Sequence, residues 1–186
     1  QLDSAAIEKR VRIEAGTLTV RYLIAAQRAI TGVLSVQLDF ALPSAAGPNG
    51  SYLLWSGRIH STDTAEWSGR IHSTAQDEAE RVPGLSSILQ RADVRVLILD
   101  DPALGGRIDL TMQPPSAAAT APLVTVSRSE SGFEKITQAA TVTLSWDVSL
   151  AAGERAERTI SLGCATTRSS DRPHADAPAV RGTGTS

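Results

Sequence analysis

The stretch Leu34–Leu42 reads LSVQLDFAL and alternates apolar with polar or small residues along its whole length. Successive side chains of a β-strand point to opposite faces, so such alternation predicts a strand with one buried and one wet face. The residues that share the apolar face are Leu34, Val36, Leu38, Phe40 and Leu42, with Ser35, Gln37, Asp39 and Ala41 opposite. A chain built around such strands is expected to form sheets rather than helices.

The same period-two pattern recurs on both sides of this stretch, at Leu18–Tyr22, Asp93–Leu99, Arg107–Met112, Leu123–Val126, Ala139–Leu150 and Arg158–Cys164. Ala151–Glu154 predicts a turn that joins the last two runs as a hairpin. Pro114–Pro122 predicts a loop, and Leu85–Arg91 a short helix. The spacing favours an all-β fold, an antiparallel β-sandwich or jelly roll of roughly eight to ten strands with at most one short helix.

Length and composition predict one domain followed by a tail. We expect residues 1–165 to form the β-sandwich domain, with a repeated hairpin at residues 51–74. Residues 166–186 contain little apolar surface apart from Val180 and scattered alanines, which predicts a polar C-terminal tail that does not fold alone.

The octapeptide WSGRIHST occurs twice, at Trp55–Thr62 and at Trp67–Thr74. As a hairpin with a three-residue loop, the repeat would place Ile59 opposite Ile71 and collect the basic side chains on its polar face. Arginine forks and histidines suit anions, so Arg58, His60, Arg70 and His72 are a candidate anion-binding site. Two simpler interpretations remain: neighbouring acidic residues neutralise this face, or one copy is a duplicated insertion that loops out. The tryptophans are expected in the core.

Composition excludes several classes of protein. The net charge of -2 argues against strong nucleic-acid binding, and no apolar run is long enough to predict a membrane span. A single cysteine, Cys164, excludes an intramolecular disulfide and is expected to be buried. The start at Gln1 instead of Met suggests signal removal, polyprotein cleavage or a trimmed chain.

No catalytic signature is present: the sequence lacks a nucleophile elbow, a phosphate-binding loop and a zinc-protease pattern. His60 and His72 have no evident third metal ligand, and Asp100-Asp101-Pro102 is read as a turn rather than a calcium site. We therefore expect no enzyme activity, no catalytic residues, no metal and no cofactor.

Two functions remain. The first is a structural subunit of a virion or extracellular assembly, of the capsid, cement or surface-filament type. Its partners would be copies of itself or other assembly subunits, and the C-terminal tail would clasp a neighbour. The alternative is a secreted carbohydrate- or anion-binding β-sandwich module that uses the Arg/His face of residues 55–74.

Overall fold

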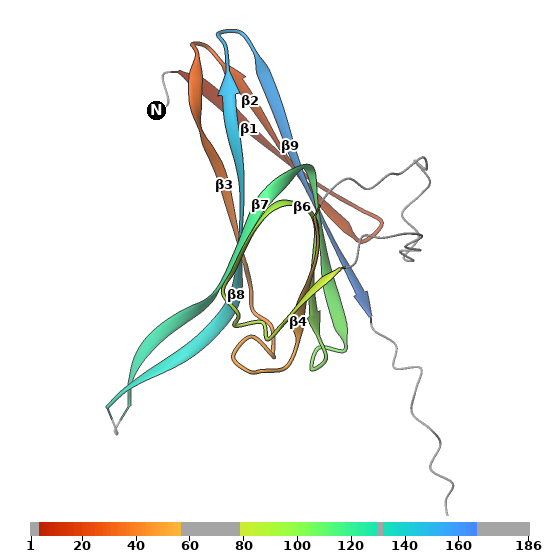
Figure 1. Ribbon diagram of the computed structural model, residues 1–186, viewed down its shortest axis with the longest axis vertical. Helices are drawn as coiled ribbons and strands as arrows, with labels where there is room; N and C mark the ends of the chain where they lie inside the picture. The colour runs from red at the N-terminus through yellow and green to blue at the C-terminus, as the bar shows by residue number, and fades with distance from the viewer. Residues whose placement is uncertain (1–3, 57–78, 130–131, 167–186) are drawn as a thin grey trace, which may run out of the picture.

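The computed structural model describes residues 4–56, 79–129 and 132–166, which form nine β-strands (Figure 1). The all-β, sandwich-like class predicted from the sequence is confirmed. Within these residues there is no helix of a length and apolarity that would cross a membrane. In chain order the strands are β1 (Ala5–Glu14), β2 (Thr17–Ala26), β3 (Ile30–Phe40), β4 (Ser51–Ser56), β5 (Glu80–Pro83), β6 (Leu89–Asp101), β7 (Gly106–Ser129), β8 (Gly132–Leu150) and β9 (Arg155–Thr166).

One antiparallel sheet folds over on itself to make two packed layers. The first layer has the order β1-β2-β9-β7-β6-β4-β5, and the second consists of β3, β8 and the far half of β7. Figure 1 shows β1, β2 and β9 on one side and β3 with β8 across from them. Strand β7 is therefore shared: Gly106–Gln113 pair with β9, and Ala117–Ser129 pair with β8.

The corner between the layers lies where β6 and β7 bend together. In β6 the register shifts between Arg91 and Val94 and again before Val96, and Asp93 has a positive φ of 54°. The facing part of β7 carries Pro114 and Pro115, residues that suit a bulge because proline lacks a ladder N–H. Strands that pass from one sheet to another through such bulges are a known way to build a corner.

The core fills the space between the layers. Trp146 is 4% exposed, and its Nε1 donates a hydrogen bond of 3.0 Å to the Pro114 carbonyl oxygen at the corner. Tyr52 donates from its hydroxyl to the Leu85 carbonyl, and burial raises its pKa to about 12. The apolar face predicted for Leu34–Phe40 packs against the same cluster. The buried members include Tyr52, Leu54, Leu89, Leu97, Leu99, Leu110, Met112, Val142, Leu144 and Ile160.

Two local predictions were wrong. Leu85–Arg91 is not a helix: Gly84–Ile88 connect β5 to β6, and Leu89 begins β6 and lies in the core. Pro114–Pro122 is not a loop but the middle of β7, in which Ala118 and Thr120 are buried. Small side chains carry weak strand propensity, and here the pairing with β6 and β8 outweighs it.

The expected hairpin of the last two strands is also corrected. β8 pairs with β3 and β7, whereas β9 pairs with β2 and β7, so the turn Ala151–Glu154 carries the chain from one layer to the other. Gly153 adopts a φ of 84°, and its N–H donates 2.8 Å to the Ala26 carbonyl, which ties the turn to the end of β2. Cys164 is exposed rather than buried, two residues from the end of β9.

Candidate functional site

A groove runs along the outer side of the corner between the two layers. It consists of two hollows of about 410 and 300 Å³ that share Ala92, Ala117 and Ser145. The larger hollow, which we call the alanine lobe, is also lined by Gln90, Arg91, Ala118, Ala119 and Thr143. The smaller one, the serine lobe, is also lined by Asp93, Pro114, Pro115, Ser116, Trp146, Asp147 and Arg158.

Two polar atoms buried beneath the serine lobe are not satisfied by the protein itself. Ser116 is 2% exposed and its Oγ has no hydrogen-bond partner. Arg158 Nε is likewise buried without a partner, although Nη1 donates 2.8 Å to the Glu157 carbonyl and Nη2 donates 3.3 Å to the Asp147 carbonyl. The two carbonyls fix the guanidinium at the wall of the lobe. A buried donor without a partner costs about 1–3 kcal/mol.

The alanine lobe has a flat floor and polar walls. Ala117, Ala118 and Ala119 of β7 form the floor, and Thr143 and Ser145 of β8 stand beside it. Arg91 does not present a free charge, because its Nε donates 2.7 Å to Glu80 and this hydrogen bond lowers the pKa of the glutamate. The lobe therefore offers close approach to the strands together with uncharged hydroxyl groups.

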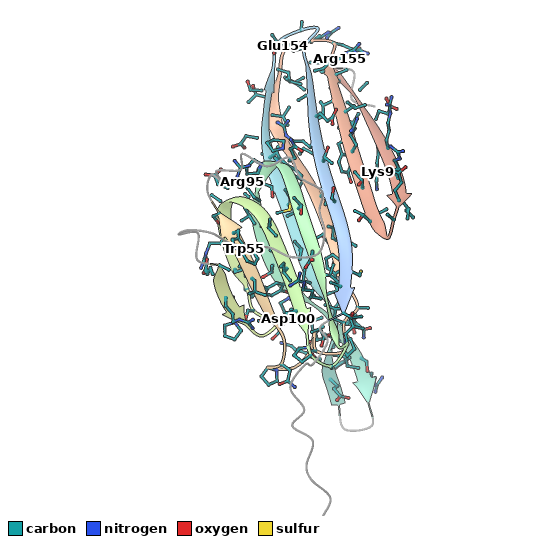
Figure 2. The ribbon with its side chains drawn as sticks, turned by 90° about the vertical axis from the view of Figure 1, so that its right-hand side faces the viewer. Lys9, Trp55, Arg95, Asp100, Glu154 and Arg155 are labelled. Carbon is teal, nitrogen blue, oxygen red and sulfur yellow. The ribbon has the colours of Figure 1, made fainter. Side chains whose placement is uncertain are left out.

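The outer face of the first layer carries Trp55, which is labelled in Figure 2. Trp55 and Leu53 of β4 are half-buried there, beside Val96 and Ile98 of β6. Trp55 thus lies outside the core, contrary to the prediction, because Tyr52 and Leu54 are the residues of β4 that face inward.

An ion pair lies further across this face. Arg107 Nε is 3.1 Å from Asp109 Oδ1, an ion pair whose geometry does not make a hydrogen bond, and the side chain of Asp109 is only 6% exposed. Burial raises the pKa of Asp109, and the arginine only partly opposes it. The carboxyl therefore pairs with Arg107 rather than with a ligand in the groove, which lies on the outer side of the other layer.

Three arginines of β1 and β2 surround a third hollow, of about 310 Å³. Each is matched by a glutamate: Arg10 with Glu8 at 2.6 Å, Arg21 with Glu157 at 3.0 Å, and Arg12 with Glu14. The patch is charge-balanced and exposed. Exposed pairs of this kind contribute little, and they leave no excess positive charge for an anion.

Asp101 confirms the turn predicted at Asp100-Asp101-Pro102. Its carboxylate accepts hydrogen bonds from Ser44 N at 3.1 Å, Ser44 Oγ at 2.5 Å, Ala103 N at 2.9 Å and Leu104 N at 3.3 Å. Burial raises the pKa of Asp101, but these hydrogen bonds outweigh it and hold the pKa below its usual value. Both oxygens of the carboxylate thus accept hydrogen bonds from within the protein.

The four residues predicted from the octapeptide, Arg58, His60, Arg70 and His72, lie outside the described residues, as do the predicted Ile59–Ile71 register and the tail beyond Thr166. The site prediction therefore stays a prediction. The sequence does not predict the groove, because its residues carry no motif and part of its floor lies in Pro114–Pro122, where a loop is expected. The one signal available was the polar face of Ala139–Leu150, which supplies Thr143, Ser145 and Asp147.

The chain matches the sequence profile of the family described as alpha-amylase/4-alpha-glucanotransferase, C-terminal, over residues 68–160. No curated protein matches the chain.

Three solved structures share its fold. A 4-alpha-glucanotransferase from Thermococcus litoralis aligns with a TM-score of 0.54 and 13% identity, over 86% of this chain and 18% of that chain. A protein assigned as an aldose 1-epimerase from Escherichia coli K12 aligns with a TM-score of 0.57 and 14% identity, over 87% of this chain and 60% of that one. A galactose mutarotase-like protein from Lactobacillus casei aligns with a TM-score of 0.50 and 12% identity, over 89% and 71%. The chain spans less than two thirds of the first two proteins.

These matches overturn the first functional hypothesis. The family profile and the structural neighbours belong to sugar-processing proteins, and none is a capsid, cement or filament subunit. The assembly function and the virion or extracellular location that depended on it are therefore wrong. The error arose because an all-β fold and a polar tail are shared by many unrelated functions. The carbohydrate-binding alternative fits the matches better.

Proposed function

Because this chain belongs to the alpha-amylase/4-alpha-glucanotransferase C-terminal family, we propose that it is a non-catalytic β-domain of an α-glucan-processing enzyme and that it binds glucan chains. The family match is the main observation that supports the proposal. The groove at the corner supports it, since both hollows fall within the size of ordinary ligand sites and are lined by hydroxyl, amide and carboxylate groups.

The position of the carboxyl group with a raised pKa supports a binding role over a catalytic one. Glycosidases as a rule use two carboxyl groups that flank the scissile bond, one of them with a raised pKa so that it donates a proton. Asp109 is a carboxyl with a raised pKa, but it is buried against Arg107 and lines neither hollow of the groove. It is not placed to protonate a ligand bound there.

The test is calorimetric titration of the full chain with maltoheptaose, with cellohexaose as the β-linked control. We expect maltoheptaose to bind at least tenfold more tightly than cellohexaose, a difference of about 1.4 kcal/mol. The mixture is then analysed chromatographically for shortened or lengthened oligosaccharides, and none is expected. New oligosaccharides would refute the non-catalytic role, and absence of maltoheptaose binding would refute the glucan-binding role.

A further inference from the structure

Three strands form the edges of the folded sheet in the part of the chain that the structure describes. β1 and β5 end the first layer, and β3, which pairs with β8 alone, ends the second. An edge presents unpaired N–H and C=O groups to other chains, and proteins usually protect it with charges, prolines, bulges or short length. Strand β5 is four residues long and ends in Pro83. Strand β1 carries five charged side chains, Glu8, Lys9, Arg10, Arg12 and Glu14.

Strand β3 lacks this protection. It is eleven residues long, contains no proline, and carries one charged side chain, Asp39, close to its end. Its pairing with β8 continues along the whole strand without a register shift, so no bulge turns the edge away. Asp39 is occupied within the chain, since it accepts hydrogen bonds from Thr141 Oγ1 at 2.6 Å and from Gln37 Nε2 at 3.1 Å. The free edge of β3 is therefore able to pair with another strand.

The side chains at this edge are only partly covered. Val33 on the outer face is 63% exposed. An apolar hollow of about 420 Å³, lined by Ile7, Ile24 and Ile30 among others, lies beside the first residues of β3. The apolar side chains that β3 directs into the sandwich pack against the core but remain half-buried: Leu34, Val36, Leu38 and Phe40. A further strand paired with β3 would remove this apolar surface from water, which is favourable.

The sequence of β3 is complementary to itself. If a two-fold axis passes through Ser35, two antiparallel copies of β3 pair along all eleven residues, and inner residues face inner residues. The one charged residue, Asp39, then faces Thr31, so no like charges are opposed. Phe40 of the second copy faces Ile30, beside the apolar hollow. The opposed pairs on the inner face are Leu34–Val36, Gly32–Leu38 and Ile30–Phe40.

Strand β1 does not have this property. A two-fold axis through Glu8, Lys9, Arg10 or Arg12 sets that charged residue opposite its own copy, and an axis through Val11 sets Arg10 opposite Arg12. Like charges opposed across strands are destabilising. Pairing through β3 therefore leaves β1 and the short β5 as protected edges, and the association ends at two copies.

We propose that two copies of this chain associate through the free edges of β3, in antiparallel register about Ser35, and form one continuous sheet from their second layers. The proposal is independent of glucan binding, because it rests on the edge and the sequence of β3. Its consequence concerns the corner groove, which Thr143 and Ser145 line from β8, the strand next to β3. In the dimer both grooves lie on the same outer face, with the two β8 strands about 14 Å apart.

Sedimentation velocity of the full chain, from about 10 μM to about 1 mM, tests the proposal, since an edge interface of modest area is expected to associate in this range. The wild-type protein should change from monomer to dimer with concentration and should form nothing larger. In Ser35→Lys or Ser35→Glu the introduced charges face each other at the axis, and each variant should raise the dissociation constant at least about tenfold. An equimolar mixture of the two variants should dimerise again, because opposite charges then face each other.

Ser127→Lys and Ser127→Glu, on an exposed part of β7, introduce the same charges away from β3 and are the matched controls. Neither should change the dissociation constant. Urea denaturation at a concentration where the wild-type protein is monomeric shows whether each variant keeps its fold. Ser35 is exposed, and its side-chain hydrogen bond with Ser145 Oγ, 3.0 Å long, lies at the surface. The urea midpoints of the Ser35 variants are therefore expected to stay close to that of the wild-type protein.

Cysteine variants test the register. In a Cys164→Ser background, Ser35→Cys brings two thiols together at the axis, at a spacing that a disulfide spans. In Gln37→Cys the two thiols are separated along the strands by four residues, which is too far for a disulfide. Under mild oxidation Ser35→Cys should therefore form an intermolecular disulfide at least about tenfold faster than Gln37→Cys.

A wild-type protein that stays monomeric up to about 1 mM would refute the proposal, as would a dimer that Ser35→Lys and Ser35→Glu leave intact. If both variants are monomeric and their mixture is monomeric too, Ser35 does not lie at a two-fold axis, and the proposed pairing is wrong. Growth beyond the dimer would contradict the closed pairing. These outcomes do not bear on glucan binding, which titration with maltoheptaose measures separately.

Discussion

At the scale of single residues, Asp101 shows how one buried carboxylate can organise two loops. It is fully buried and accepts hydrogen bonds from Ser44 in the loop after β3 and from Ala103 and Leu104 in the turn after β6. A buried carboxylate is tolerated only when its oxygens are satisfied, and here both are. The side chain therefore has a structural role, in agreement with the turn that the sequence predicts at Asp100-Asp101-Pro102.

We predict that Asp101→Ala lowers the free energy of unfolding by about 3 kcal/mol, because several buried donors lose their shared acceptor. The measurement is urea denaturation at neutral pH, with the exposed Glu134→Ala as control. A change below about 0.5 kcal/mol would mean that the loops do not depend on this carboxylate.

The same residue makes the stability depend on pH. The pKa of Asp101 is lower in the folded chain than in the unfolded chain, so its contribution is complete above the unfolded value of about 3.9. That contribution is lost as the pH falls through the folded pKa. As the pH falls below about 4, the advantage of the wild-type protein over Asp101→Ala should therefore shrink, and the two urea midpoints should move closer together.

At the scale of elements, β7 and β8 extend beyond the sandwich as a two-stranded arm, residues 122–129 and 132–138, which projects from the body in Figure 1. Burial begins only at Ala139, and the arm exposes large apolar side chains instead of covering them. These are Leu123, Val124, Val126, Phe133 and Ile136, with Phe133 83% exposed. A two-stranded ribbon on its own is marginally stable in water. The arm therefore depends for its stability on the parts of β7 and β8 that lie within the sheet.

We predict that the arm contributes little to the stability of the domain. Replacing residues 124–138 with Asn-Gly would connect Leu123 to Ala139, which already face each other, through a two-residue hairpin turn. The unfolding free energy should change by less than about 1 kcal/mol, since no core residue is removed. Differential scanning calorimetry checks this, and Phe133→Ser serves as a milder comparison. A chain that fails to fold without the arm would contradict the prediction.

How far the sequence predicts these elements depends on what each residue pattern encodes. Alternation encodes which face is buried, and it identified β2, β3 and β8 correctly down to Trp146 and Val148. It does not encode the partner of a strand, which is why β8 and β9 were expected to pair. Alternation gives no signal where the residues are alanine and proline, so the sequence predicts a loop instead of a strand at the middle of β7. The groove is assembled from residues of four strands, β6 to β9, and no local pattern signals such a site.

At the scale of the whole molecule, β6 and β7 join what would otherwise be two separate layers. Leu89 of β6 pairs with Thr120 in the second layer, while Asp101 at its other end pairs with Gly106 in the first. The core on either side of the bend is one continuous cluster that includes Leu97, Leu110 and Leu144. Neither layer can lose its packing without exposing the apolar face of the other.

This continuity predicts a single cooperative unfolding transition with a graded native-state hydrogen exchange. Amides of β6 and the first half of β7 should exchange most slowly, at the rate of global unfolding, because their strands are paired on both sides in the interior of the sheet. Amides of the edge strand β1 and of the arm should exchange fastest, since most of their side chains are exposed. Hydrogen exchange followed by mass spectrometry over increasing urea measures both quantities. If the amides of β3 and β8 exchanged through an opening that left β2 and β9 protected, the layers would be independent units, and the bend would be a hinge rather than the element that couples them.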